Sequence, residues 1–214
     1  MIQIYGHPFA AFVWKPLIAA YARSVPFEFC IVDPDHAANQ ARMAELSPTG
    51  QFPALVDGDR EITESNAVVE YLDRFGDSPP LVPAERDTAL AARMLADVFD
   101  DYVAAPMQRI VAEALRGEAE KDPRGVADAT ATLDRTYAWL APRIGDRWAT
   151  GNAFTLADCA AAPALFYADW VHPIPAGPLS AYRARLLAYA PVAQVVDEAR
   201  PYRSFFPLGA PDRD

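Results

Sequence analysis

The stretch 47–72 constrains the fold most, because it carries the signals for four consecutive elements. An apolar run at 51–56 has a proline near its start, which suits the beginning or edge of a sheet because proline cannot donate to a ladder. Asp57-Gly58 is a hairpin turn signal, and a second short strand follows at 61–63. From Glu64 onward the apolar residues recur at helical spacing. The stretch therefore predicts strand, hairpin, strand and helix in that order.

Two places in this stretch suit a ligand. A cis bond between Phe52 and Pro53 would turn the backbone N–H and C=O of Phe52 outward. Cis bonds are about 5–6% of X–Pro bonds, so an ordinary trans loop proline is the alternative. Ser65 is a good N-cap residue, and the free N–H groups of a helix N-terminus suit a carboxylate. The simpler interpretation of Ser65 is that it only caps its own helix.

Composition excludes several classes of protein. The chain has 214 residues, enough for one large domain or two small ones, and its net charge of −10 argues against nucleic acid or an anionic membrane as a partner. Cys30 and Cys159 are its only cysteines and lie far apart, which argues against a disulfide scaffold, a zinc knuckle and a redox dithiol. We recognise no secretion signal and no apolar run of membrane-spanning length, so we expect a cytoplasmic protein.

The first part of the chain predicts a small unit of mixed helix and strand. A strand at 1–5 precedes a helix from about Ala10, and a second strand at 25–32 precedes a weaker helix at 34–46. This β-α-β order predicts a parallel pair with a right-handed crossover, whereas the later hairpin predicts an antiparallel edge.

The second part predicts helices only. A segment at 76–83 is rich in proline and small polar residues, as linkers are, and no strand-like alternation returns after Arg86. The predicted helices are 88–115, 126–144, 156–170 and 180–199. The third begins at Thr155-x-x-Asp158, a capping box with aspartate in the place usually held by glutamate or glutamine. Because this motif is structural, we exclude it from the active site.

The ordered set of motifs resembles one family. Segment 50–55 (GQFPAL), a hairpin and segment 64–72 (ESNAVVEYL) together resemble the glutathione-binding half of a cytosolic glutathione transferase. The resemblance implies an α+β protein with an N-terminal thioredoxin-like βαβαββα domain at 1–77. It also implies an all-helical C-terminal domain at 86–214, and a homodimer.

The resemblance assigns glutathione binding to a set of six residues. These are Gln51, Phe52, Pro53, Glu64, Ser65 and Asn39. The Phe52 backbone would pair with the cysteinyl part of glutathione, Glu64 would meet the γ-glutamyl ammonium group, and Ser65 would meet its carboxylate. Gln51 stands where lysine or glutamine is common, and Asn39 falls near a basic position that holds the glycyl carboxylate in some classes. No metal is implied.

The residue expected to activate the thiol is absent. A free cysteine thiol has a pKa of about 8.5, so a transferase must supply donors that stabilise the thiolate. In many members a serine or cysteine does this, but its position here falls on Ala10, and the neighbouring Ala11 cannot replace it. The alternatives are the backbone N–H groups at 10–12, the phenol of Tyr5 and the ring of His7. We rank the backbone first and Tyr5 second.

A second substrate would lie between the two halves. Residues that suit an apolar pocket there are Phe9, Phe12, Tyr102, Met107, Phe166, Trp170 and His172, with Tyr102 and Trp170 preferred. The alternative is that most of them are core residues, as aromatic residues at helical spacing usually are. Asp97, Asp100 and Asp101 form an acidic patch that we interpret as a solvated face rather than a metal site.

The sequence thus favours an enzyme that conjugates the glutathione thiol to an apolar, electrophilic small molecule. The alternative is a non-catalytic glutathione-binding carrier or protein-interaction module with the same fold, which the alanine at position 10 favours. A glutathione-dependent thiol-disulfide reductase is disfavoured, because no cysteine lies near Ala10.

Overall fold

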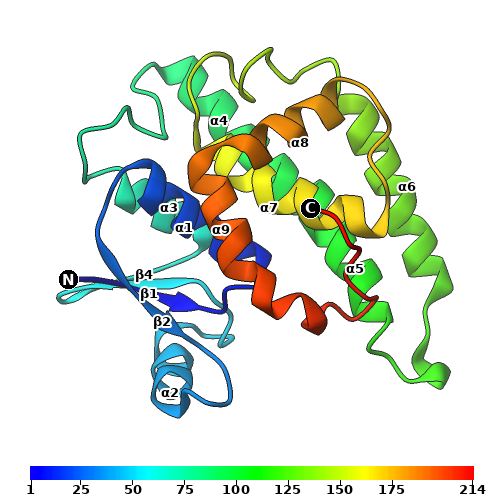
Figure 1. Cartoon of the computed structure of the whole chain (residues 1–214), viewed down its shortest axis with the longest axis horizontal. Coiled ribbons are helices and arrows are strands. Elements are labelled where there is room, and N and C mark those ends of the chain that lie inside the picture. The colour runs from blue at the N-terminus through cyan, green and yellow to red at the C-terminus, as the bar shows by residue number, and fades with distance from the viewer.

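The computed structural model describes residues 1–214, and its first part is a four-stranded sheet (Figure 1). The strands are β1 (Ile2–Gly6), β2 (Phe27–Ile31), β3 (Ala54–Asp57) and β4 (Arg60–Thr63), in the spatial order β2-β1-β3-β4. β1 and β2 are parallel, whereas β3 is antiparallel to both β1 and β4. The parallel pair and the antiparallel hairpin edge predicted from the sequence are both present.

Helices cover both faces of this sheet. α1 (Ala11–Ala22) and α3 (Ser65–Leu72) lie on one face, and α2 (Ala37–Leu46) lies on the other (Figure 1). Successive strand residues point to opposite faces. Accordingly, Ile4 belongs to the main core on the α1 side, while Tyr5 joins a small cluster with residues of α2.

The second part of the chain is entirely helical. Its helices are α4 (Arg86–Phe99), α5 (Ala105–Glu113), α6 (Pro123–Leu140), α7 (Leu156–Val171), α8 (Pro178–Ala188) and α9 (Ala190–Ala199). Short helical turns occupy Glu118–Glu120 and Arg200–Phe205. The predicted fold class is confirmed, whereas the domain limits at 77 and 86 stay a prediction. None of the helices has both the length and the apolar character needed to cross a membrane.

Two predicted helices are interrupted. A π-helical turn, Asp100–Ala104, separates α4 from α5 inside the segment predicted as one helix. A second break occurs at Tyr189, which has extended backbone angles between α8 and α9. Pro191 lies in the first turn of α9, where its missing N–H leaves no hydrogen bond unmade. The chain therefore restarts a helix there rather than continuing one.

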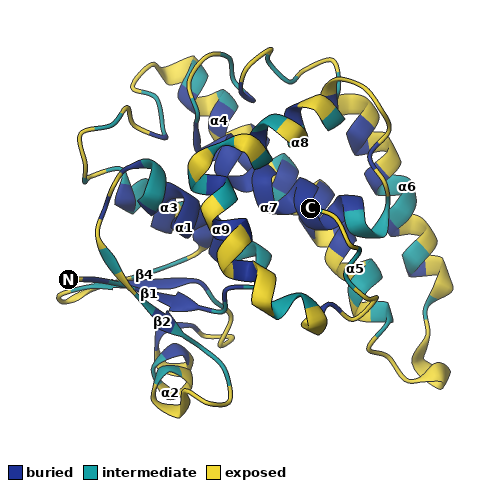
Figure 2. Ribbon diagram, viewed as in Figure 1, coloured by how far each residue is buried: buried dark blue, intermediate teal, exposed yellow.

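Two helices are buried on all sides. Every residue of α7 from Leu156 to Asp169 is buried, as is every residue of α1 from Val13 to Ala20 (Figure 2). A helix in this position lies inside a core rather than on its surface. One apolar cluster includes residues of both helices and of the sheet, so the two halves of the chain pack around a shared core.

The capping box at the start of α7 is confirmed. Oδ2 of Asp158 accepts hydrogen bonds from the N–H of Thr155 at 2.8 Å and from its hydroxyl at 3.0 Å. Oδ1 accepts two more, from the N–H of Ala149 at 2.8 Å and from the hydroxyl of Tyr182 at 2.6 Å. The fully buried carboxylate therefore joins the start of α7 to the preceding loop and to α8.

We predict that Asp158→Ala lowers the free energy of unfolding by about 3–5 kcal/mol, because it leaves several buried donors without an acceptor. Loss of a helix cap alone would cost only about 0.5–2 kcal/mol. Urea denaturation measures the difference. The matched control is Asp128→Ala on the exposed face of α6, which should change stability by less than about 0.5 kcal/mol. Equal unfolding midpoints for the two variants would contradict the prediction.

Candidate functional site

Three hollows meet beside Phe52, whose side chain lines all of them. The apolar hollow has a volume of about 490 Å³ and lies between the start of α1, α5 and the C-terminal turn at 205–207. The histidine hollow, of about 1130 Å³, lies between the loop after β2 and the same C-terminal turn. The acidic hollow, of about 380 Å³, lies at the start of α3 beside α4.

The backbone at Phe52 is free to bind a ligand. The Phe52–Pro53 peptide bond is cis, so the ordinary trans proline is not what this chain adopts. Pairing between β1 and β3 begins only at Ala54, and the N–H and C=O of Phe52 have no hydrogen-bond partner within the chain. One donor and one acceptor are therefore available where the hollows meet.

Predicted glutathione-binding residues line the acidic hollow. Gln51, Pro53, Glu64 and Ser65 all contribute to its wall. Glu64, not Ser65, is the N-cap of α3, so the assignment of Ser65 as the cap was wrong by one position. Ser65 is instead the first helical residue; only 8% of it is exposed, and its hydroxyl makes no hydrogen bond within the chain. That hydroxyl and the helix N-terminus together suit a carboxylate.

The backbone of Glu64 is strained. Its φ of 66° and ψ of 118° lie in a region that side-chain-bearing residues rarely adopt. Such conformations cost about 1–3 kcal/mol and cluster at binding and catalytic sites. The strained residue adjoins Ser65, and both lie in the wall of the acidic hollow.

The end of α4 and the π-helical turn that follows it add acidic side chains to this hollow. Asp97, Asp100 and Asp101 line it, so the patch is part of a cleft and not only a solvated face. Oδ2 of Asp100 accepts hydrogen bonds from Nζ of Lys15 at 2.5 Å and from Nδ2 of Asn66 at 3.1 Å. Burial raises the pKa of Asp100 and lowers that of Lys15, and their mutual attraction opposes both shifts. The structure contains no group of histidine, cysteine and acidic side chains placed to hold a metal ion.

The start of α1 faces the point where the hollows meet. Ala10 is the N-cap of α1 and lines both the apolar and the histidine hollows. Its own N–H already donates to the carbonyl of His7 at 3.0 Å. The N–H groups of Ala11 and Phe12 have no acceptor within the chain, as is usual in the first turn of a helix. Of the three backbone donors predicted at 10–12, only the N–H groups of Ala11 and Phe12 are therefore free.

The two side-chain alternatives lie in different places. Tyr5 is on the α2 side of the sheet, lines none of the hollows, and its hydroxyl donates to Oε1 of Gln3 at 3.4 Å. His7 lines the histidine hollow, where its Nδ1 accepts a hydrogen bond from the N–H of Phe9 at 3.1 Å. Burial lowers the pKa of His7, so its ring is neutral at neutral pH. The structure therefore does not bring Tyr5 to the meeting point.

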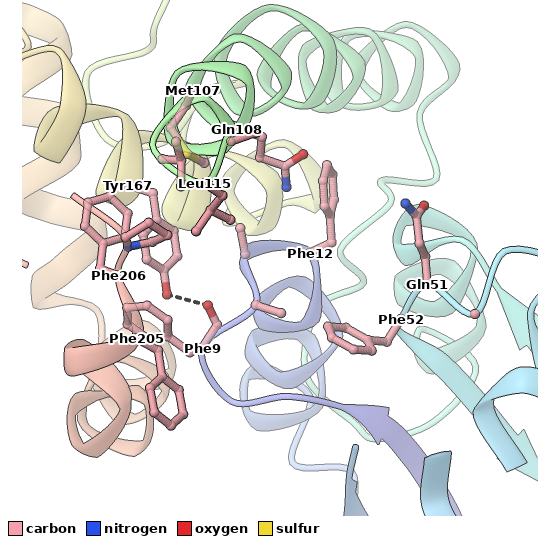
Figure 3. A pocket seen from close by; sticks show the side chains of 16 residues that line it. Phe9, Phe12, Gln51, Phe52, Met107, Gln108, Leu115, Tyr167, Phe205 and Phe206 are labelled. Atoms are coloured by element: carbon pink, nitrogen blue, oxygen red, sulfur yellow. Dashed lines mark hydrogen bonds between the residues drawn. The ribbon is translucent and has the colours of Figure 1, made fainter. Parts of the chain in front are cut away.

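Aromatic residues from three parts of the chain line the apolar hollow (Figure 3). Phe9 and Phe12 lie there as predicted, and Tyr167 joins them from α7. The hydroxyl of Tyr167 donates to the carbonyl of Phe9 at 2.9 Å, so it is not free to act on a ligand. Phe205 and Phe206 complete the wall; they follow the last helical pattern in the sequence, where no signal marks them as pocket residues.

The tail after α9 is folded against the body rather than extended. Arg200 Nη2 bonds Asp214 at 2.9 Å, and Arg203 pairs with the same carboxylate. Arg213 forms a further ion pair with Asp169 on α7. These contacts hold the segment that carries Phe206, which is only 6% exposed.

Besides Tyr5, five residues predicted for the site do not line the hollows that meet at Phe52, namely Asn39, Tyr102, Phe166, Trp170 and His172. Tyr102 is 55% exposed and lies in a separate shallow hollow on the α6 side. Trp170 packs behind the wall, with its ring centroid 5.0 Å from that of Phe206. The amide of Asn39 donates to the carbonyl of Ile31 at 2.8 Å, so it anchors α2 to β2.

Family models match both halves of the chain. Residues 4–80 match the glutathione S-transferase N-terminal domain, and residues 100–202 match the glutathione S-transferase C-terminal domain. The chain belongs to the glutathione transferase family. Among curated relatives, a glutathione S-transferase of Silene vulgaris is 27% identical over 78% of this chain and 81% of its own length.

Two further similar proteins are a relative that has a different name and a solved structure that contains glutathione. A stringent starvation protein A homolog of Coxiella burnetii is 26% identical, over 88% of this transferase-family chain and 87% of its own length. The solved structure of a glutathione S-transferase from Methylobacillus flagellatus with glutathione bound has a TM-score of 0.80 and 21% identity. It covers 91% of this chain and 98% of its own. At 21% sequence identity, this similarity shows only that the two proteins share a fold.

The buried lysine is a feature that sequence reasoning missed. Lys15 is only 1% exposed and joins α1 to the π-helical turn through Asp100. We predict that Lys15→Met lowers the free energy of unfolding by about 3–5 kcal/mol, because it leaves a buried carboxylate unpaired. Thermal and urea denaturation measure this loss.

Two variants control for this effect. Lys121→Met changes the chain's other lysine, which is exposed, and should shift stability by less than about 0.5 kcal/mol. Adding Asp100→Asn to Lys15→Met should recover part of the loss, since it removes the unpaired charge. If the double variant were less stable than Lys15→Met alone, the unpaired charge would not be the cause.

Proposed function

We propose that this chain binds glutathione with its thiol beside Phe52 and transfers that thiol to an apolar electrophile. The observation that carries the proposal is the meeting of an apolar and a polar hollow at one free backbone donor and acceptor. In this arrangement the γ-glutamyl end lies in the acidic hollow. Its carboxylate faces Ser65 at the start of α3, and its ammonium group faces Glu64 and the aspartates of the π-helical turn.

The start of α1 supplies the stabilisation of the thiolate. The free N–H groups of Ala11 and Phe12 point from a helix N-terminus, whose partial positive charge favours an anion. That charge is worth about 0.3–1 kcal/mol when exposed and up to about 2 kcal/mol when partly buried. Since about 1.4 kcal/mol corresponds to one pKa unit, the thiol pKa falls by about 1.5 units at most. The protein is therefore a weaker activator than one with a hydroxyl at position 10.

The apolar hollow indicates the class of second substrate. None of its lining residues is aspartate, glutamate, histidine, lysine or arginine. The hydroxyl of Tyr167, the only other titratable group there, is occupied by the Phe9 carbonyl. A charged substrate would lose its hydration without gaining a partner, which is costly. An uncharged apolar electrophile fits this wall.

A second function is a non-catalytic carrier of glutathione or of its conjugates. The observation in its favour is Ala10, which places a methyl group where a donor to sulfur would stand. Fold alone does not decide between carrier and enzyme. Calorimetric titration with glutathione, paired with a panel of chromogenic electrophiles, separates them. Binding without turnover supports the carrier, and absence of binding at millimolar glutathione contradicts both functions.

We predict that Ser65→Ala weakens glutathione binding about tenfold, because a hydrogen bond to a charged carboxylate is lost, worth about 1.5–3 kcal/mol. Calorimetry measures the change. Ser78→Ala in the linker, which lines none of the hollows, is the matched control and should bind as the parent does. Unchanged affinity in the Ser65 variant would place the γ-glutamyl end elsewhere.

We predict that Ala10→Ser lowers the pKa of the bound thiol by about one to two units, since a hydroxyl donor to the thiolate adds about 1.5–3 kcal/mol. At neutral pH the conjugation rate should rise about tenfold. The ultraviolet absorbance of the thiolate and a chromogenic electrophile measure the two effects. Ala37→Ser at the start of α2 controls for a serine at a helix start away from the hollows. If both variants behaved alike, position 10 would not face the sulfur.

A further inference from the structure

The hollows that meet at Phe52 contain no accessible cation. No lysine or arginine lines any of them. Their acidic residues are Asp33 and Asp35 in the histidine hollow and Glu64, Asp97, Asp100 and Asp101 in the acidic hollow. Lys15 lies behind this wall, but it is buried and its ammonium group is paired with Asp100. An anionic ligand therefore enters a negatively charged cleft, in a chain whose net charge is −10.

Glutathione carries two carboxylates and one ammonium group. In the proposed binding mode, the acidic hollow takes the γ-glutamyl ammonium and carboxylate, which leaves the glycyl carboxylate on the side of the histidine hollow. No lysine or arginine lines that hollow, burial lowers the pKa of His7, and Nδ1 of His36 is already 2.7 Å from Oδ1 of Asp33, so that any charge on this imidazole is offset within the pair. The amide of Asn39 is held by Ile31. A glycyl carboxylate is thus unpaired and repelled.

The size and lining of the histidine hollow point to a larger ligand. Its volume of about 1130 Å³ exceeds that of the other two hollows combined and is far more than a glycyl group fills. Apolar side chains of Ile31, Met43 and Tyr202 form part of its wall, next to the carboxylates of Asp33 and Asp35. Apolar surface beside carboxylates suits a methylene chain that ends in an amine, as in the snorkelling of lysine.

We propose that the preferred thiol of this protein is glutathione whose glycyl carboxyl is masked as an amide, with an amine-bearing arm in the histidine hollow. The amide removes the repelled carboxylate, and the ammonium group faces Asp35 and Oδ2 of Asp33, the oxygen that neither His36 nor the N–H of Asp35 occupies. This inference rests on the proposed function, because it takes the thiol to lie beside Phe52. Beyond that function, it specifies the charge and the size of the glycyl-side group that the site selects.

Calorimetry at about pH 8, where imidazoles are mostly neutral, tests the preference. The ligands are glutathione, its glycyl ethyl ester and its glycyl amide with 1,3-diaminopropane. We expect the ester to bind about fivefold more tightly than glutathione, and the amine-bearing amide more tightly still. Added salt should strengthen the binding of glutathione and weaken that of the amide, because screening reduces both repulsion and attraction.

A charge-insertion variant gives a second, independent test. Gln40 lines the histidine hollow from α2 and makes no side-chain hydrogen bond, so Gln40→Lys places a cation there. We expect this variant to bind glutathione about fivefold more tightly and to lose its preference for the ester. Ala41→Lys adds the same charge at an exposed position of α2 that lines none of the hollows. It should retain the parental preference.

The outcomes separate this inference from the proposed function. If glutathione binds as tightly as its ester and amide or more tightly, the inference is wrong and the proposed function stands. Binding of the amide that is insensitive to salt, or equal behaviour of the two lysine variants, also overturns the inference. If none of the three thiols binds at millimolar concentration, both the inference and the proposed function fail.

Discussion

The burial of α1 between the sheet and the helical half is the constraint on which the site depends. The indole of Trp14 packs against Phe166 and Tyr167 of α7, with ring centroids 4.8 and 5.2 Å away. The ammonium group of Lys15 meets Asp100 in the π-helical turn. These contacts fix the start of α1 relative to Phe52, which comes from a different segment of the sheet half. The geometry of the cleft is therefore a property of the core.

This arrangement separates the residues proposed to hold glutathione from those that would activate its thiol. Ser65 and Phe52 belong to the strand, hairpin and helix unit, and both offer free polar groups to the cleft. Ala10 belongs to α1 and offers only a methyl group, so activation falls to the backbone N–H groups that follow it. A helix dipole lowers a thiol pKa less than a hydroxyl donor does. In the proposed function, glutathione binding by one unit and weak activation of its thiol by another are therefore compatible in one chain.

The sequence predicted the fold well and also predicted the residues from Gln51 to Pro53 and at Glu64 and Ser65 that line one hollow, because turn signals, capping residues and helical spacing are local. Local patterns also identified Thr155 and Asp158 as a capping box. They did not reveal the burial of Lys15, since lysine is rarely buried and its partner lies 85 residues away. The same limit applies to Phe206, whose place in the cleft depends on ion pairs formed by the folded tail. In the sequence, Tyr102 and Trp170 cannot be told apart from the aromatic residues that line the cleft. Only the packing of the folded chain shows that Tyr102 is exposed elsewhere and that Trp170 lies behind the wall.

In the proposed binding mode, a glutathione thiol lies between Phe52 and the start of α1, with the apolar hollow beyond it. A crystal structure with S-hexylglutathione tests it most directly, because the ligand marks both sides of the sulfur. We expect hydrogen bonds to the Phe52 backbone, the γ-glutamyl carboxylate at Ser65, and the hexyl chain against Phe12 and Phe206. A hexyl chain in the histidine hollow, or a ligand that does not contact Phe52, would contradict it.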